Sequence, residues 1–129
     1  MAESIILRTS VELGIVPTHI KFVGGLVPEE GRLPRGDDGK LLVITEMAHL
    51  VAKSSVKFGC VQISVFPGVE PADNDEMIEG LKALGLAVHL ILMVGGANPM
   101  KPEDEDAVVG MLVDGLTLAK QHEITQVAS

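Results

Sequence analysis

The sequence predicts an α/β protein built from parallel βα repeats. Apolar segments of strand length are centred near Ile63, Leu90 and Val127, and amphipathic segments of helical length separate them. Strands that alternate with helical crossovers are typical of a parallel sheet. The chain has 129 residues, 47% hydrophobic and 22% charged, which suits one domain over residues 1–129 with about four strands and three main helices.

The N-terminal quarter is expected to carry one strand and a loop. Residues 1–18 form an N-terminal arm or a short helix in this interpretation, and residues 20–25 form a short strand that ends at Gly24 and Gly25. Residues 27–40 contain prolines, glycines and seven charged residues, which indicates a surface loop. This loop is either a lid over a polar substrate or a disordered excursion.

The middle of the chain predicts two helices around a strand. Residues 41–55 form the first helix, and residues 61–66 form a strand that Pro67 and Gly68 terminate. The second helix is expected to begin at Asp73, with Glu76 three residues later in a capping-box spacing. Gly85 provides its C-terminal stop.

The C-terminal third predicts a strand, a helix and a last strand. Residues 87–94 form the strand, which Gly95 and Gly96 close, and Pro102 opens the third helix. Residues 124–128 begin a further strand. The buried stripe of the third helix is expected to contain Val108, Val109, Leu112, Val113, Leu116 and Ala119.

The polarity of the strands favours a barrel over an open doubly wound sheet. Gln62 and Ser64 share one face of their strand, and His89, Lys21 and Gln126 put polar groups in the others. A barrel interior accepts such groups near its mouth, whereas helices cover both faces of a doubly wound sheet. Polar edge strands in an open sheet remain the alternative. A complete barrel takes about 250 residues, so the chain is either a fragment or completes its sheet with another copy.

Charge and hydropathy exclude several classes of protein. The net charge of −8 supplies no basic field for nucleic acid. No apolar run reaches the roughly 18 residues that span a bilayer, and the N-terminus lacks the pattern of a secretory signal. Cys60 is the single cysteine and has no internal disulfide partner. We therefore expect a cytoplasmic protein that binds neither nucleic acid nor membrane.

Three segments resemble the N-terminal half of a xylose isomerase-like TIM barrel, namely residues 61–68, 90–100 and 103–109. The likeness covers about residues 19–129 and rests on the texture and order of the segments. That superfamily holds sugar isomerases and epimerases, so the resemblance implies proton transfer next to the carbonyl of a sugar-like substrate. It also implies a divalent metal ion. The metal ligands of the family lie mainly on later strands, so no metal ligand or catalytic residue is assigned, and the chain is expected to be inactive alone.

The candidate substrate-binding residues follow the predicted strands, where barrel active sites lie. Phe66 would form an apolar wall and the amide of Asn98 would bond a hydroxyl, while His89 would bond a hydroxyl or transfer a proton unless it is a core histidine. Glycines that let a ligand approach the backbone are Gly24, Gly25, Gly95 and Gly96. The alternative function is a non-catalytic α/β binding or assembly module that forms a homodimer through its sheet edge.

Overall fold

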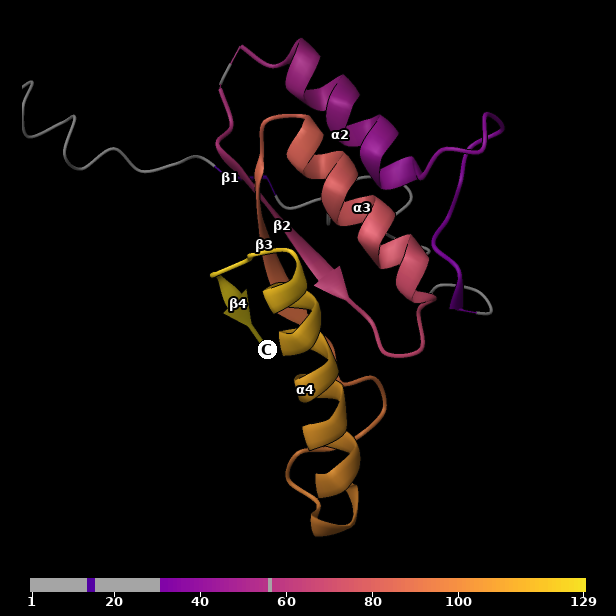
Figure 1. Ribbon diagram of the computed structural model, residues 1–129, viewed down its shortest axis with the longest axis vertical. Helices are drawn as coiled ribbons and strands as arrows, with labels where there is room; N and C mark the ends of the chain where they lie inside the picture. The colour runs from indigo at the N-terminus through magenta and orange to yellow at the C-terminus, as the bar shows by residue number, and fades with distance from the viewer. Residues whose placement is uncertain (1–13, 16–30, 56) are drawn as a thin grey trace, which may run out of the picture.

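The computed structural model describes residues 14–15, 31–55 and 57–129. Within them, four parallel strands form one sheet in the order β1-β2-β3-β4. The strands are β1 (Gly14–Ile15), β2 (Cys60–Val65), β3 (Ala87–Leu92) and β4 (Val127–Ala128). The helices are α2 (Leu42–Lys53), α3 (Pro71–Ala83) and α4 (Glu105–Gln121), and the 3-10 turn η4 (Pro102–Asp104) leads into α4 (Figure 1). The prediction of a parallel α/β fold is confirmed.

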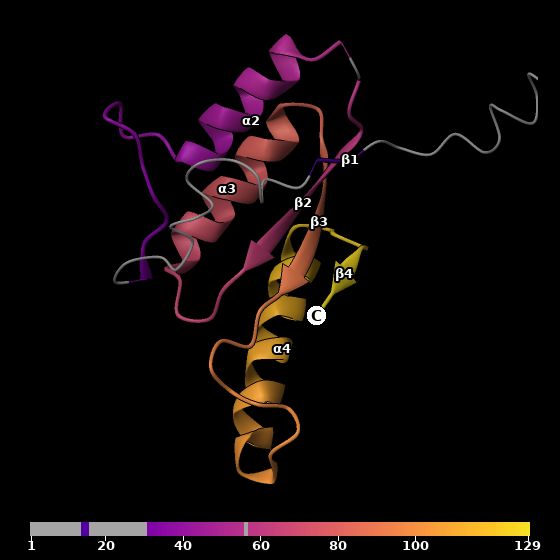
Figure 2. The ribbon, with the colours of Figure 1, turned by 180° about the vertical axis from the view of Figure 1, so that it is seen from behind.

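All three described helices pack on the same side of the sheet. Alternate residues of β2 and β3 are buried, such as Ile63 and Leu90, and they share one apolar core with residues of α2, α3 and α4. The side chains between them, including Gln62 and His89, are half-buried. Figures 1 and 2 show the strands in front of the helices from one side and behind them from the other. The described helices therefore cover one face of the sheet, and the opposite face is the more polar of the two.

The core is aliphatic and fits the spacing of each element. In α2, Val43 and Met47 are one turn apart and both buried. In α3, Met77, Ile78 and Leu81 form the buried face. The strands β2 and β3 contribute Val61, Ile63, Val65, Val88, Leu90 and Leu92.

The helix α4 differs from its predicted packing. The sequence predicts Val109, Val113 and Leu116 on the buried stripe, but each of these residues is about half exposed. The buried positions are Val108, Gly115 and Ala119. The apolar residues of α4 cover more than one face, so periodicity alone chose too wide a stripe.

The helix α3 begins earlier than predicted. Pro71 occupies its first turn after Glu70, so Asp73 lies inside the helix and its side chain makes no cap. Its carboxylate instead accepts hydrogen bonds from the loop before α2. The capping-box interpretation is therefore wrong, because a distant loop outcompetes the local backbone for this carboxylate.

The first and last strands of the sheet also differ from the prediction. Gly14 and Ile15 lie in the expected arm, yet they pair in parallel with Cys60 and Val61. The predicted strand at residues 20–25 lies outside the described residues. The last strand is shorter than predicted, since Ile124 donates its amide to the end of α4. None of the described helices is long and apolar enough to cross a membrane.

Two glycines of α4 should respond oppositely to alanine. A Cβ at Gly115 would lie 2.5 Å from the side chain of Leu92, whereas a Cβ at Gly110 meets no atom within 4 Å. We expect Gly115→Ala to lower the free energy of unfolding by about 1 to 2 kcal/mol through overpacking. Gly110→Ala should raise it by up to about 1 kcal/mol through helix propensity. Urea unfolding of both variants checks this, and a stabilising Gly115→Ala would contradict the packing of α4 on β3.

Candidate functional site

A pocket of about 660 Å³ opens at the carboxyl ends of β2 and β3. The amide of Met93 donates to the carbonyl of Val65 at 2.9 Å, so the two strands stay paired up to the pocket. The loops that follow β2 and β3 therefore lie next to each other at the carboxyl end of the sheet. The lining residues are Gly31, Phe66, Pro67, Gly68, Met93, Val94, Gly95 and Gly96.

Three of the predicted site residues come together in this pocket: Phe66, Gly95 and Gly96. Gly95 has a positive φ of 61°, and an added Cβ would lie 3.2 Å from the ring of Pro67. A side chain at position 95 would thus be strained and crowded. The sequence pattern found these residues because each follows a strand.

Gly31 also lines the pocket but comes from the loop before α2 and follows no predicted strand, so its role was not predicted from the sequence. Its φ is 76°, and a Cβ there would collide with the carbonyl of Gly68. The amide of Glu70 donates to the carbonyl of Gly31 at 2.7 Å. This close backbone approach puts the loop against the end of β2. No local sequence signal connects the two segments, which lie far apart in the chain.

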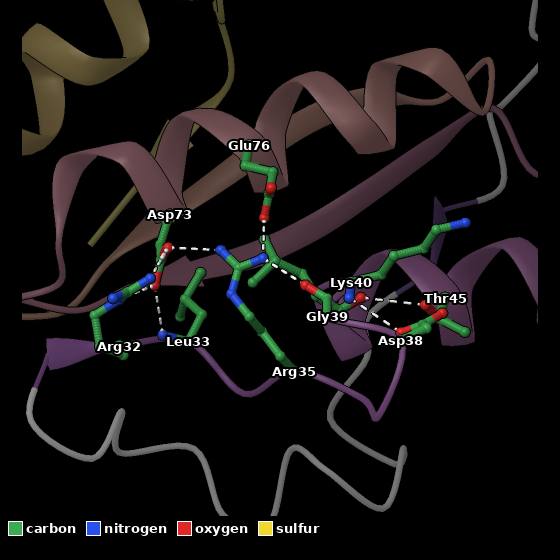
Figure 3. Close-up of polar contacts among 10 residues, drawn as sticks. Arg32, Leu33, Arg35, Asp38, Gly39, Lys40, Thr45, Asp73 and Glu76 are labelled. Atoms are coloured by element: carbon green, nitrogen blue, oxygen red, sulfur yellow. Dashed lines mark hydrogen bonds and ion pairs between the residues drawn. The ribbon is translucent and has the colours of Figure 1, made fainter.

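The buried carboxylate of Asp73 holds that loop in place (Figure 3). Its side chain is 1% exposed and accepts from Arg32 Nε at 2.9 Å and from Arg35 Nη2 at 2.9 Å. The backbone amide of Leu33 donates to it at 3.0 Å. The hydrogen bond from Arg32 lowers the pKa of Asp73 most, and together with the bonds from Leu33 and Arg35 it outweighs the opposing effect of burial.

Arg35 extends this cluster to the next turn of α3 and back to its own loop. Its Nη1 lies 2.8 Å from Glu76 Oε2 and donates to the carbonyl of Gly39 at 2.8 Å. Residues 31–40 therefore form a surface loop that is anchored to α3 by charged hydrogen bonds. The alternative of a disordered excursion does not describe this part of the predicted 27–40 loop.

The other predicted site residues lie elsewhere. His89 sits within β3, level with Gln62 of β2, and does not line the pocket. Asn98 Oδ1 accepts a hydrogen bond from the backbone amide of Met100 at 2.9 Å, and the backbone amide of Asn98 donates to Asp104 Oδ2 at 2.9 Å. Asn98 thus shapes the loop before η4. Gly24 and Gly25 lie outside the described residues.

The register places a polar row across the face that the three described helices do not cover. Gln62 is level with His89, and Leu90 is level with Val127, so Gln126 occupies the position beside His89. The amide of Leu90 donates to the carbonyl of Gln126 at 3.0 Å. Among the described residues, no group of three or more His, Cys, Asp or Glu side chains is arranged to hold a metal ion.

A second polar cluster joins α3 to the end of α4. His122 Nε2 lies 2.6 Å from Asp75 Oδ1, and His122 Nδ1 lies 2.6 Å from Glu79 Oε1. Lys82 donates to the carbonyl of His122. A neutral imidazole has one N–H, so the ring bonds both carboxylates only in its charged form. Burial lowers the pKa of His122, but the hydrogen bonds and charges of Asp75 and Glu79 prevail and raise it above 6.5.

Removing the charge of Asp73 should destabilise the protein. We expect Asp73→Asn to lower the free energy of unfolding by about 1 to 3 kcal/mol near neutral pH, because the amide carries no charge and replaces one of the two acceptor oxygens with an NH2 donor. The two guanidinium groups stay partly solvated, which limits the loss. The pKa of Asp73 is lower in the folded than in the unfolded protein. Its stabilisation is therefore complete above the ordinary value of 3.8 and is lost as the pH falls further.

Urea unfolding against pH checks this, with Asp37→Asn as the matched control at an exposed loop carboxylate. Equal stabilities of the two variants at neutral pH would contradict a structural role for the Asp73 cluster.

The His122 cluster should stabilise the protein in its charged form. Because the folded-state pKa is raised, the contribution is complete below about 6.5 and disappears as the pH rises through the folded-state value. His122→Gln should cost about 1 kcal/mol below that range and little at alkaline pH. Thermal unfolding against pH measures the difference, with His49→Gln on the exposed side of α2 as control. A cost of His122→Gln that does not change with pH would refute the charged clamp.

No protein-family model matches the chain, and neither curated proteins nor solved structures are significantly similar to it. The chemistry and position of the strand-end pocket therefore carry the functional conclusion.

Proposed function

We propose that the strand-end pocket binds a small sugar-like compound, and that the chain is the N-terminal half of a sugar isomerase- or epimerase-like βα barrel. The observation that carries this proposal is the position of the pocket. It lies beyond the carboxyl ends of two adjacent parallel strands, which is where parallel α/β folds bind their ligands.

The lining of the pocket favours a neutral, hydroxylated ligand. Phe66 and Met93 offer apolar surface to the C–H faces of such a compound. The glycine backbones at positions 68, 95 and 96 bring peptide groups within reach of hydroxyls without intervening side chains. The described lining residues carry no charged side chain, so a phosphorylated ligand would find no cation among them.

The two faces of the sheet support its place in a barrel. Helices cover one face, and the opposite face carries Gln62 beside His89. In a closed barrel the helix-free face lines the interior, which accepts polar side chains. A consecutive strand order is also the order of a (β/α)8 barrel.

The proposed chemistry is proton transfer next to a carbonyl, with a divalent metal ion polarising the oxygens. In this proposal further strands supply the acid–base pair and the metal ligands, and this chain supplies the wall of the substrate site. The chain alone is then expected to bind substrate in the cytoplasm without turning it over.

A second candidate function is an assembly module that pairs through the edge of β4. The amide of Leu90 bonds the carbonyl of Gln126, and Leu90 is level with Val127. In parallel pairing, this register directs the amide and carbonyl of Val127 away from β3. An edge with outward backbone groups is suited to pairing with another strand.

Ligand binding can be tested by amide NMR of the labelled chain during titration with an unphosphorylated ketose. We expect concentration-dependent shifts at Gly68, Gly95 and Gly96, and none at Gly39 or Gly85. Gly96→Val adds bulk at a position where a Cβ meets no atom within 4 Å, so it should fold and weaken the apparent affinity. We expect about a tenfold loss from the occupied space.

Gly110→Val on α4 is the matched control and should bind as the original chain does. Shifts spread over the whole surface, or none at molar ketose, would refute the pocket as a sugar site. Stronger binding of the corresponding sugar phosphate would refute the preference for a neutral ligand.

A further inference from the structure

The helix α4 carries an exposed apolar stripe on one flank. Val109, Val113 and Leu116 are 52%, 53% and 53% exposed. Their spacing of four and three residues places them on one face of the helix. The buried face holds Val108, Gly115 and Ala119 instead. Large apolar side chains in a continuous exposed row are characteristic of an interaction surface.

Two residues of opposite charge lie at the two ends of the same stripe. Glu105 lies four residues before Val109, and Lys120 lies four residues after Leu116, so both share this face. Both are exposed, and neither belongs to any of the ion pairs of the described residues. The stripe is thus acidic at its start, apolar in its centre and basic at its end.

This pattern is complementary to itself when reversed. We propose that a second copy of this chain docks on the stripe with its own α4 antiparallel. Glu105 then faces Lys120 of the second copy, and Lys120 faces its Glu105. Val109 packs against Leu116 of the second copy, and Val113 lies near the two-fold axis. A two-fold interface of this kind uses the same patch on both subunits.

The described neighbours of α4 leave this flank about half exposed. In the proposed barrel, a helix after β4 would compete with the second copy for the same flank. The ring of His122 reaches α3 from a different flank of the helix. The first half of α4 projects beyond the ends of β2 and β3 in both views (Figures 1 and 2). A second helix can therefore lie along the stripe without entering the core.

The size of the patch predicts a weak dimer. Stable complexes bury about 1,200 to 2,000 Å² in total, and one helix face offers less. We expect a monomer–dimer equilibrium that depends on protein concentration.

Analytical ultracentrifugation of the full 129-residue chain tests the proposal. Val113→Lys should lower the association constant at least ~10-fold, since it places two like charges beside the two-fold axis. Gln121→Lys adds the same charge to an exposed position on another flank of α4 and should leave association unchanged. Circular dichroism of both variants verifies that they are folded.

Charge reversal determines the orientation of the two helices. Glu105→Lys and Lys120→Glu should each weaken the dimer, and the double variant should restore it. In a parallel pair, Glu105 would face Glu105 of the second copy, and Lys120 would face Lys120. Reversing either charge would replace one like-charge contact with another, so neither single variant would weaken the dimer. Weakening by both single changes with rescue by the double change therefore supports the antiparallel arrangement.

Three results would overturn the proposal. A chain that stays monomeric at near-millimolar concentration has no such interface. A dimer that survives Val113→Lys unchanged uses another surface, such as the edge of β4. A dimer that loses affinity equally with Val113→Lys and Gln121→Lys does not distinguish the two flanks of α4, so the stripe is not its interface. None of these results bears on the strand-end pocket, whose ligand test is independent of association.

Discussion

The parallel pairing of β2 with β3 is the interaction on which the rest of the structure depends. Six register pairs join them, from Cys60–Ala87 to Val65–Leu92. Because successive strands pair in chain order, right-handed crossovers bring each connecting helix to the same face. Every second side chain of both strands is therefore buried under helices. Complete burial of a valine or leucine contributes about 1.5 to 3 kcal/mol, so these two strands carry much of the core.

The same pairing creates the candidate site. Because the two strands run in the same direction and end at the same level, the loops that follow them begin side by side. The pocket forms between those loops. Glycine at position 95 permits a backbone conformation that a larger residue would resist. In the described part of the loop that carries Gly31, residues 31–40 pair with none of the four strands. Charged hydrogen bonds to Asp73 provide the missing restraint.

The exposed surfaces of α3 and α4 differ in polarity. Toward α2 and its loop, α3 presents Asp73 and Glu76, and toward α4 it presents Asp75 and Glu79. An acidic chain would repel itself at such a density of carboxylates. Two arginines and a charged histidine offset that repulsion within the fold. On the far flank of α4, Val109, Val113 and Leu116 are each about half exposed between Glu105 and Lys120.

The sequence by itself determined the order and type of the elements. Alternating apolar residues marked β2 and β3, helical spacing marked the segments between them, and the residues after each strand led to Phe66, Gly95 and Gly96. These signals are local, because they come from backbone periodicity and from turn residues. The exposure of Val109 and Leu116 was not predictable in this way. Periodicity identifies apolar faces but not the number of neighbours available to cover them.

Only the tertiary structure decided the partners of residues that are distant in the chain. Asp73 had the spacing of a helix cap, yet it bonds Arg32 and Arg35, about forty positions earlier. Asn98 had the chemistry of a ligand group, yet it bonds its own loop. A hydrogen-bonding side chain takes the best partner that the folded chain brings near it, and sequence spacing does not encode that choice.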